Sequence, residues 1–344
     1  MTRSLLVACV ALMIGACSSA NGSVAPGRSL PAVAPQNLRA SPAAAGNVYV
    51  ANWYGSDVTV YSPGGTTLLR TITSGIANPN ALALNKSATL YVGNYGSPSG
   101  SFTSSVSVYG PGSIQPARVI ASGVVGPYAI AFGQSGDVYV ANHGADTVTV
   151  YAPGSTSVLR TISAAIRGPE ALAFNAAEDL YVANYANNTV SVYAPAKLQP
   201  TKIYTVGVSR PTALAFDDAQ NLYVANHLAN TVTVYRPLHK DMPRTISDGV
   251  GQPVGIISTA SKELYVLNYS KNTVTVYSEA TLGLVRTISS GIACPTAMAL
   301  SVSGTLYVAN TCPSTISVYS SSGSKPTGSI TRGIDGPVSI GVEP

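Results

Sequence analysis

The most constraining feature of this 344-residue chain is a motif that returns at a nearly constant interval. Leu-Tyr-Val-Ala-Asn, or a close variant, occurs seven times, and its successive tyrosines lie 42 residues apart except for one step of 48. A repeat of this length builds an array or a ring from copies of one supersecondary unit. The tyrosines of the seven copies are Tyr49, Tyr91, Tyr139, Tyr181, Tyr223, Tyr265 and Tyr307.

Each repeat contains four short strand-like runs, which we call the inner, second, third and outer strands. In one repeat the first three are residues 169–174, 180–184 and 189–193, and the run 159–162 is the outer strand of the preceding repeat. The runs are rich in Val, Thr and Tyr, are separated by polar breaks, and show no helical periodicity. Four short strands in a unit of about 40–45 residues are typical of a β-propeller blade.

The two ends of the repeat region complement each other. The chain enters at a second strand, residues 48–52, and leaves after an inner strand, residues 337–342. Pairing them completes one blade and removes two open sheet edges. The sequence therefore predicts an all-β fold: a seven-bladed β-propeller with four antiparallel strands per blade, closed by the C-terminal strand pairing with the N-terminal blade.

Three motifs between Val48 and Val342 carry a family resemblance: Tyr-Val-Ala-Asn, Asn-Thr-Val-Thr-Val-Tyr and Pro-x-Ala-Leu-Ala. The chain resembles bacterial seven-bladed propellers of the YVTN and NHL-repeat type. It departs from them in that YVTN repeats usually carry Thr where Ala51 stands, and NHL repeats carry Asp where Asn52 stands. The resemblance implies the fold but not the function, because propellers include hydrolases, lyases, receptors and scaffolds.

The N-terminal residues are typical of a bacterial lipoprotein. Residues 1–16 place Arg3 before an apolar run that is too short to span a membrane, as in a signal peptide. The tetrad that ends at Cys17 resembles the lipobox, which implies lipidation of Cys17; the alternative is ordinary secretion with cleavage near Ala20. Residues 17–46 are rich in Ala, Pro and Ser and indicate a tether before a propeller over 47–344. We expect a lipid-anchored extracytoplasmic monomer, at the outer membrane, in the periplasm or at the cell surface.

The net charge of +5 does not indicate a nucleic-acid partner. Basic residues recur at equivalent outer-strand positions, so they lie around the circumference instead of forming the clustered patch that phosphate recognition requires. A basic residue on an exposed edge strand opposes edge-to-edge aggregation. These residues are Arg70, Arg118, Arg160, Lys202, Arg244 and Arg286.

Two of the four cysteines occur in the last full repeat. Cys294 lies just before an inner strand, and Cys312 lies two residues after the end of the following second strand. If Leu300 lies about opposite Thr305, the cysteines face each other at the open end of a hairpin, within the roughly 4.4–6.8 Å between Cα atoms that a disulfide requires. We predict a Cys294–Cys312 disulfide, as suits an oxidising compartment; two free thiols are the alternative.

Two rings of side chains are candidates for a binding face. By resemblance, the turns between second and third strands share a face with the linkers between blades, and ligands bind there. One ring follows the Asn that ends each second strand, and the other follows the Pro that opens each inner strand. The Asn ring itself (Asn52, Asn94, Asn142, Asn184, Asn226, Asn268, Asn310) suits a structural role in turns. The expected binding residues are Trp53, Tyr95, His143, Tyr185, His227, Tyr269, Asn80 and Tyr128, unless they only cover the turns of their own blades.

Little in the sequence indicates catalysis. Glu170 is the one acid in the ring nearest the axis and is a weak catalytic candidate, because general acid–base chemistry needs a partner group. We expect neither a metal site nor a cofactor. The sequence favours a non-enzymatic binding or scaffold propeller that presents one loop face to a protein or glycan. The alternative is a lactonase-like hydrolase or lyase with a site at the central channel. Six added residues lengthen one loop, within 95–105.

Overall fold

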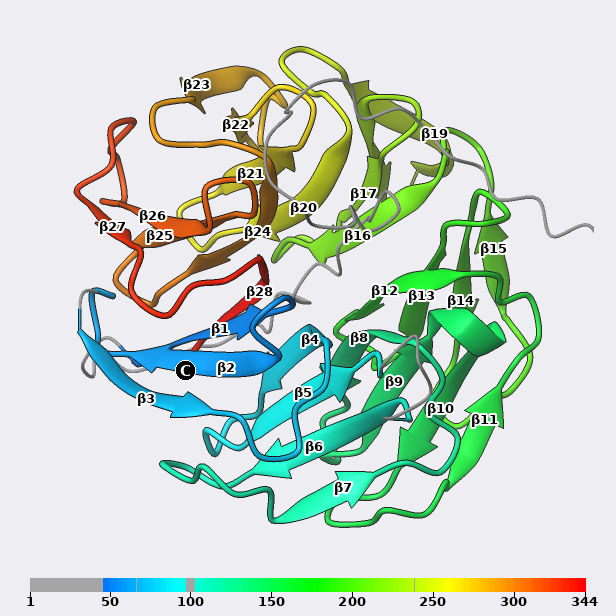
Figure 1. Cartoon of the computed structure of the whole chain (residues 1–344). Helices are drawn as coiled ribbons and strands as arrows, with labels where there is room; N and C mark the ends of the chain where they lie inside the picture. Colours follow the sequence, from blue (N-terminus) through cyan, green and yellow to red (C-terminus); the bar gives the residue numbers. More distant parts are fainter. Residues whose placement is uncertain (1–45, 66, 97–102, 238) are drawn as a thin grey trace, which may run out of the picture.

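The computed structural model describes residues 46–65, 67–96, 103–237 and 239–344. These residues form a ring of seven four-stranded sheets around a central channel, so the predicted seven-bladed β-propeller is confirmed (Figure 1). The expected signal peptide, most of the expected tether with Cys17, and the middle of the lengthened loop lie outside the described residues. Within the described residues, no helix is long and apolar enough to cross a membrane.

Each blade contains four antiparallel strands, in sequence order from the channel outwards in blades 2 to 7 and in the order β28-β1-β2-β3 in blade 1. The inner strands, for blades 1 to 7, are β28 (Pro337–Val342), β4 (Pro79–Leu84), β8 (Pro127–Phe132), β12 (Pro169–Phe174), β16 (Pro211–Phe216), β20 (Pro253–Ser258) and β24 (Pro295–Leu300). The second strands are β1 (Val48–Asn52), β5 (Leu90–Asn94), β9 (Val138–Asn142), β13 (Leu180–Asn184), β17 (Leu222–Asn226), β21 (Glu263–Asn268) and β25 (Leu306–Asn310).

The two remaining strands of each blade lie farther from the axis. The third strands are β2 (Asp57–Tyr61), β6 (Ser105–Tyr109), β10 (Thr147–Tyr151), β14 (Thr189–Tyr193), β18 (Thr231–Arg236), β22 (Thr273–Ser278) and β26 (Thr315–Tyr319). The outer strands are β3 (Leu68–Ile72), β7 (Arg118–Ile120), β11 (Arg160–Ile162), β15 (Lys202–Tyr204), β19 (His239–Ile246), β23 (Leu284–Ile288) and β27 (Gly328–Ile330). A short 3-10 helix, η1 (His143–Ala145), follows β9.

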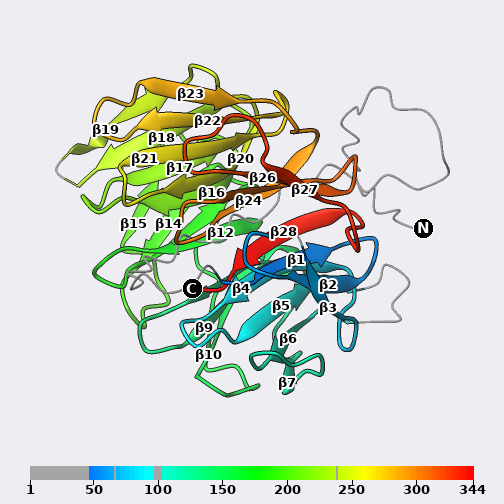
Figure 2. The ribbon, with the colours of Figure 1, turned by 90° about the vertical axis from the view of Figure 1, so that its left-hand side faces the viewer.

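Ring closure occurs as predicted. β28, from the C-terminal end of the chain, pairs antiparallel with β1 of the N-terminal blade, with Val342 opposite Val48 and Ile340 opposite Val50. Figure 2 shows β28 lying beside β1. Blade 1 is therefore made from both ends of the chain, and no inner strand is left without a second strand beside it.

The tyrosines of the second and third strands pack between blades, as the sequence predicted. Those of the third strands also tie down the linker that enters their own blade: the Tyr151 hydroxyl donates to the Ser122 carbonyl at 2.6 Å, and Tyr109 donates to Ser74 at 2.6 Å. A buried hydroxyl needs such a partner, so each third-strand Tyr combines apolar packing with one hydrogen bond.

The basic residues of the outer strands have a role that the sequence did not reveal. Arg160 reaches back across its blade and donates to the Tyr139 hydroxyl of β9 at 2.7 Å, with its guanidinium carbon 5.6 Å from the ring centroid. Arg70 with Tyr49 and Arg118 with Tyr91 repeat this arrangement. These cations are spread around the ring as expected, but several are turned inward instead of guarding the outer edge.

Two kinds of hydrogen bond between a side chain and a linker N–H, which we call latches, recur in all seven blades and hold the linkers in place. In the first, the ring Asn accepts from a linker N–H of its own blade, as Asn184 Oδ1 does from Arg167 N at 3.2 Å. Its Nδ2 donates to a third-strand hydroxyl, Ser191 Oγ, at 2.9 Å. The structural role predicted for these Asn residues is confirmed.

The second latch joins neighbouring blades. A side chain in the turn between second and third strands accepts from the linker N–H of the next blade, as Asn188 Oδ1 does from Arg210 N at 2.8 Å. Asn188 has a φ of 59°, a left-handed conformation that Asn tolerates better than most residues. The other latches of this kind join Ser56 to Asn78, Ser104 to Gly126, Asp146 to Gly168, Asn230 to Gln252, Asn272 to Cys294 and Ser314 to Gly336.

The predicted disulfide between Cys294 and Cys312 is present, with 5.6 Å between the Cα atoms. The expected strand register was wrong by one residue, because Leu300 pairs with Leu306. A β-bulge between Pro295 and Ala297 then shifts the pairing, so that Pro295 lies opposite Asn310. The bond joins the linker that enters blade 7 to the turn that follows β25.

Candidate functional site

One end of the channel, which we call the linker face, is formed by the linkers and the turns between second and third strands. Backbone hydrogen bonds bring these segments together in each blade: Tyr185 N donates to the Gly168 carbonyl at 3.0 Å, and His143 N donates to Gly126 at 3.0 Å. The residue after each ring Asn is thereby held beside the start of the inner strand. The two candidate rings predicted from the sequence consequently share this face.

A β-bulge near the start of every inner strand orients the ring nearest the axis. In β12 the pairing with β13 passes from Pro169 directly to Ala171, which leaves Glu170 as the extra residue. Bulges change the direction of a side chain and are common beside functional sites. The same bulge explains why the side chain after each Pro is directed differently from the regular, packed positions that follow it.

Four aromatic side chains form a continuous series on the linker face, the aromatic arc: Trp53, Tyr95, Tyr128 and His143. The ring centroids of Trp53 and Tyr95 are 5.7 Å apart, those of Tyr95 and Tyr128 are 6.3 Å apart, and Tyr128 stacks on His143 at 4.4 Å. The residues come from blades 1, 2 and 3 and are partly exposed, with Tyr95 at 39%. The arc therefore offers a row of aromatic surface that crosses blade boundaries.

The arc ends beside a buried carboxylate. His143 Nε2 lies 3.9 Å from Glu170 Oε1; the Glu170 side chain is only 2% exposed, whereas that of His143 is 34% exposed. Burial lowers the pKa of His143, and the Asp146 carboxylate opposes this shift only in part. The imidazole is thus neutral at neutral pH and can both donate and accept a hydrogen bond.

A second group lies in blades 4 and 5, on the other side of Glu170. The Tyr185 and His227 rings are 6.4 Å apart, and the Arg210 guanidinium carbon is 5.4 Å from the Tyr185 centroid. Burial raises the pKa of the Tyr185 hydroxyl, and the Glu170 carboxylate adds to this shift. Burial also lowers the pKa of His227, although a hydrogen bond with the Pro253 backbone opposes the change.

The other predicted binding residues do not join the arc. Asn80 is 1% exposed, and its Nδ2 donates to the Pro127 carbonyl of the next blade at 3.1 Å. Thr212 and Thr296 make the equivalent contact, each at 2.8 Å, so these three residues of the ring join neighbouring blades. Tyr269 packs against the apolar core of blades 6 and 7, as in the alternative that such residues cover their own turns.

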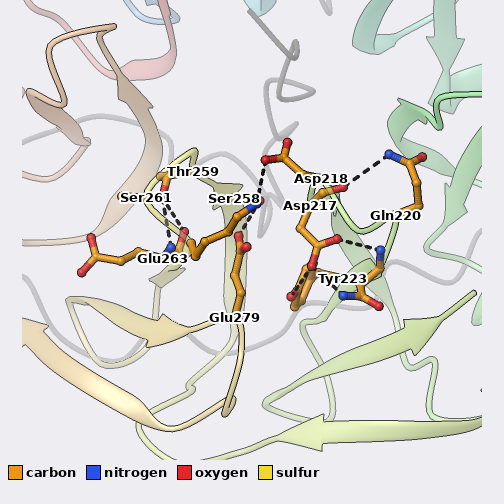
Figure 3. Close-up of polar contacts among 11 residues, drawn as sticks. Asp217, Asp218, Gln220, Tyr223, Ser258, Thr259, Ser261, Glu263 and Glu279 are labelled. Atoms are coloured by element: carbon orange, nitrogen blue, oxygen red, sulfur yellow. Dashed lines mark hydrogen bonds and ion pairs between the residues drawn. The ribbon is translucent and has the colours of Figure 1, made fainter. Parts of the chain in front are cut away.

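The opposite end of the channel, which we call the hairpin face, is formed by the turns between inner and second strands and between third and outer strands. It has features that the sequence did not suggest. Figure 3 shows Asp217, Asp218, Glu263 and Glu279 gathered around the turns of blades 5 and 6. Each carboxylate has a partner within the protein; Asp217, for example, accepts from the Tyr223 hydroxyl at 3.0 Å. Burial raises the pKa of Glu279, and the Asp217 carboxylate adds to it. Over the residues that the structure describes, no group of three or more His, Cys, Asp or Glu side chains could hold a metal ion.

A large cavity also opens at the hairpin face. Its volume is about 1110 Å³, and its wall is formed by inner-strand side chains of blades 1, 2, 3, 6 and 7. The signal in the sequence is the last residue of each inner strand, which is Phe in blades 3 to 5 and a smaller residue in the other four. The difference between Phe and a smaller residue at this position can be seen when the repeats are aligned. Whether it leaves a cavity depends on how neighbouring blades pack.

No protein-family model matches the sequence, and no curated protein matches it either. Solved structures do match. A protein of unknown function from Desulfotomaculum acetoxidans is 16% identical, covers 86% of this chain and 98% of its own, and superposes with a TM-score of 0.70. A protein from Bacteroides uniformis, assigned only provisionally as a 6-phosphogluconolactonase, is 16% identical over 87% and 100% of the chains, with a TM-score of 0.71. A streptogramin B lyase is 10% identical over 82% and 90%, with a TM-score of 0.65. At such identities the likeness shows the propeller fold alone.

Proposed function

We propose that this protein is a non-enzymatic binding propeller that presents its linker face to a protein or glycan partner outside the cytoplasm. The observation that carries the proposal is the aromatic arc, which continues across blades 1 to 3 and ends at the His143–Glu170 pair. Partly exposed Tyr, Trp and His rings supply large contact areas with little loss of conformational freedom, which is why binding hot spots favour Trp and Tyr.

The chemistry of the arc suits recognition better than catalysis. Its one carboxylate, Glu170, is buried beside a neutral imidazole and aromatic rings instead of facing a second acid. Paired acid and base roles need two titratable groups whose surroundings separate their pKa values. The His143–Glu170 contact is the observation that favours the alternative, a lactonase-like hydrolase or lyase, and the test below distinguishes the two functions.

We expect Tyr128→Ala and His143→Ala each to weaken ligand binding by at least tenfold, because each removes one side of the 4.4 Å stack. Ligands would be found by screening the full chain on a glycan array and against a displayed peptide library. Leu159→Ala is the control, since Leu159 is 53% exposed but lies beside the outer strand β11 on the outside of the ring, away from the linker face. Equal binding of a ligand by all three variants would contradict the proposal. The proposal would also be contradicted if the protein hydrolysed a lactone and Glu170→Gln abolished that activity.

The proposed location rests on Cys17, which we expect to carry the lipid anchor. Cys17→Ala should abolish labelling by a fatty-acid probe and move the protein from the membrane fraction to the soluble fraction. Cys9→Ala, which changes the cysteine within the apolar run, is the control and should leave labelling unchanged. A Cys17→Ala protein that is still labelled and remains in membranes would show that the lipobox assignment is wrong.

A further inference from the structure

The cavity at the hairpin face has an aliphatic wall. Leu82, Ile130, Met298, Leu300, Ile340 and Val342 line it, and all six belong to inner strands. Its volume of about 1110 Å³ is slightly above the roughly 300–1,000 Å³ that small-molecule sites occupy. It lies at the opposite end of the channel from the aromatic arc, so the arc does not account for it.

Four of the five blades whose inner strands line the cavity differ from the others at one repeat position. The inner strands of blades 3 to 5 end in Phe, and each Phe ring packs edge-on against the second-strand Tyr of the preceding blade, at centroid distances of 4.9, 4.9 and 4.8 Å. The other four blades carry Leu84, Ser258, Leu300 and Val342 at this position, and all four residues line the cavity. None of the three Phe residues lines it. One side of the channel is therefore closed by aromatic pairs, and the other side is left open.

The mouth of the cavity is polar, and the charged side chains on its described wall are paired with each other. The two charged side chains that line it, Glu263 and Arg286, form an ion pair at 2.7 Å. The remaining polar lining consists mostly of hydroxyls such as Ser258 and Ser303. The acids just beyond the rim are also satisfied within the protein: Glu279 accepts from Ser258 at 2.6 Å, and Asp218 pairs with Lys262 at 2.6 Å (Figure 3).

We propose that this cavity binds an uncharged small molecule with an aliphatic body and a hydroxyl or carbonyl group at the rim. An apolar wall favours burial of hydrocarbon by roughly 25 cal/mol per Å². A charged head group would lose hydration, and no side chain on the wall offers it a free counter-charge, because Glu263 and Arg286 already neutralise each other. The site is independent of the aromatic arc and of the partner proposed for it.

The test uses 1-decanol as the probe, with decanoate and decylammonium as charged molecules of the same chain length. Binding is measured by displacement of the neutral dye Nile red from the full chain carrying Cys17→Ala, which cannot hold an acyl group at that cysteine. We expect 1-decanol to bind at least tenfold more tightly than either ion. The double variant Leu300→Phe/Val342→Phe should raise its Kd at least tenfold. It should fold normally, because three blades already hold Phe at this position.

Three further variants keep the result unambiguous. Met298→Gln changes the polarity of the wall at nearly constant volume and should also weaken 1-decanol binding. Leu159→Phe makes the same kind of substitution at a side chain that is 53% exposed on the outside of the ring, and it should have no effect. Tyr128→Ala should also leave 1-decanol binding unchanged, which separates this site from the arc. Absence of 1-decanol binding, equal binding by the Phe variant, or tighter binding of either ion would overturn the proposal.

Discussion

Deleting residues 336–344 should abolish the cooperative unfolding transition of the propeller or lower its Tm by at least about 10 °C. The deletion removes β28, whose Val338 and Ile340 are 3% and 0% exposed. Each such side chain contributes about 1.5–3 kcal/mol on burial, within a total stability of about 5–15 kcal/mol for a typical domain. In a domain of about 300 residues, about 1 kcal/mol corresponds to slightly less than about 2 °C in Tm.

Loss of β28 would also remove a hydrogen-bond acceptor from polar groups of β4, of β24 and of the turn after β25. The Pro337 carbonyl accepts from both Thr296 and Thr311 at 2.8 Å, and Ser339 Oγ accepts from Leu82 N at 3.2 Å. The damage thus extends into blades 7 and 2. Trimming a free terminus has no such consequence.

A rearranged chain provides the control. Moving residues 336–344, with a short Gly linker, to a position between residues 45 and 46 keeps every residue and joins β28 directly to β1. Calorimetry should show nearly the parental Tm for this chain, because blade 1 is complete again. If the deletion variant melts within a degree or two of the parent, β28 does not close the ring.

Replacing both Cys294 and Cys312 with Ser should lower the free energy of unfolding by up to about 3 kcal/mol, the chain-entropy estimate for a short closed loop. The cysteines are 18 residues apart, and the β24–β25 hairpin already restrains them, so about 3 kcal/mol is an upper figure. The expected change in Tm is up to about 5 °C for a domain of about 300 residues. Differential scanning calorimetry of the full chain measures it.

The redox state supplies a matched control for that variant. Reduction should lower the Tm of the parent and leave the Tm of the Ser variant unchanged. Mass spectrometry of the unreduced, alkylated protein should find residues 294 and 312 in one cross-linked peptide pair. Alkylation of both cysteines without prior reduction would refute the bond.

Most of the fold could be predicted because the number of repeats at 42-residue spacing equals the number of blades. The incomplete repeats at the two ends identify the strand that closes the ring. The disulfide was predictable because Cys294 and Cys312 flank the open end of one hairpin, so an error of one residue in register did not separate them. The inward turn of Arg160 onto Tyr139 was not predictable, since it depends on the direction of a long side chain across two strands.

The candidate site was only partly predictable for the same kind of reason. Repeat spacing placed Tyr95, Tyr128 and His143 on one face, but ring contact depends on the bulge at the start of each inner strand and on the turn geometry. Asn80 also follows the Pro at this bulge, but it does not join the aromatic arc, because its amide donates to the Pro127 carbonyl of the next blade. The cavity was missed because the four residues smaller than Phe that line it are 42 or more positions apart in the sequence. No local sequence pattern shows that an aromatic contact between blades is absent.

The latch between neighbouring blades has an evolutionary consequence. Every 42-residue unit carries both halves of the connection, a turn that accepts and a linker that donates, as Asn188 and Arg210 illustrate. A unit copied within the gene would therefore bring its own means of attachment to the units on either side. Duplication can lengthen such a chain without redesign of any interface, and the number of copies is limited only by the geometry that lets the last unit meet the first. The Cys294–Cys312 bond then distinguishes the unit of blade 7 from the other copies.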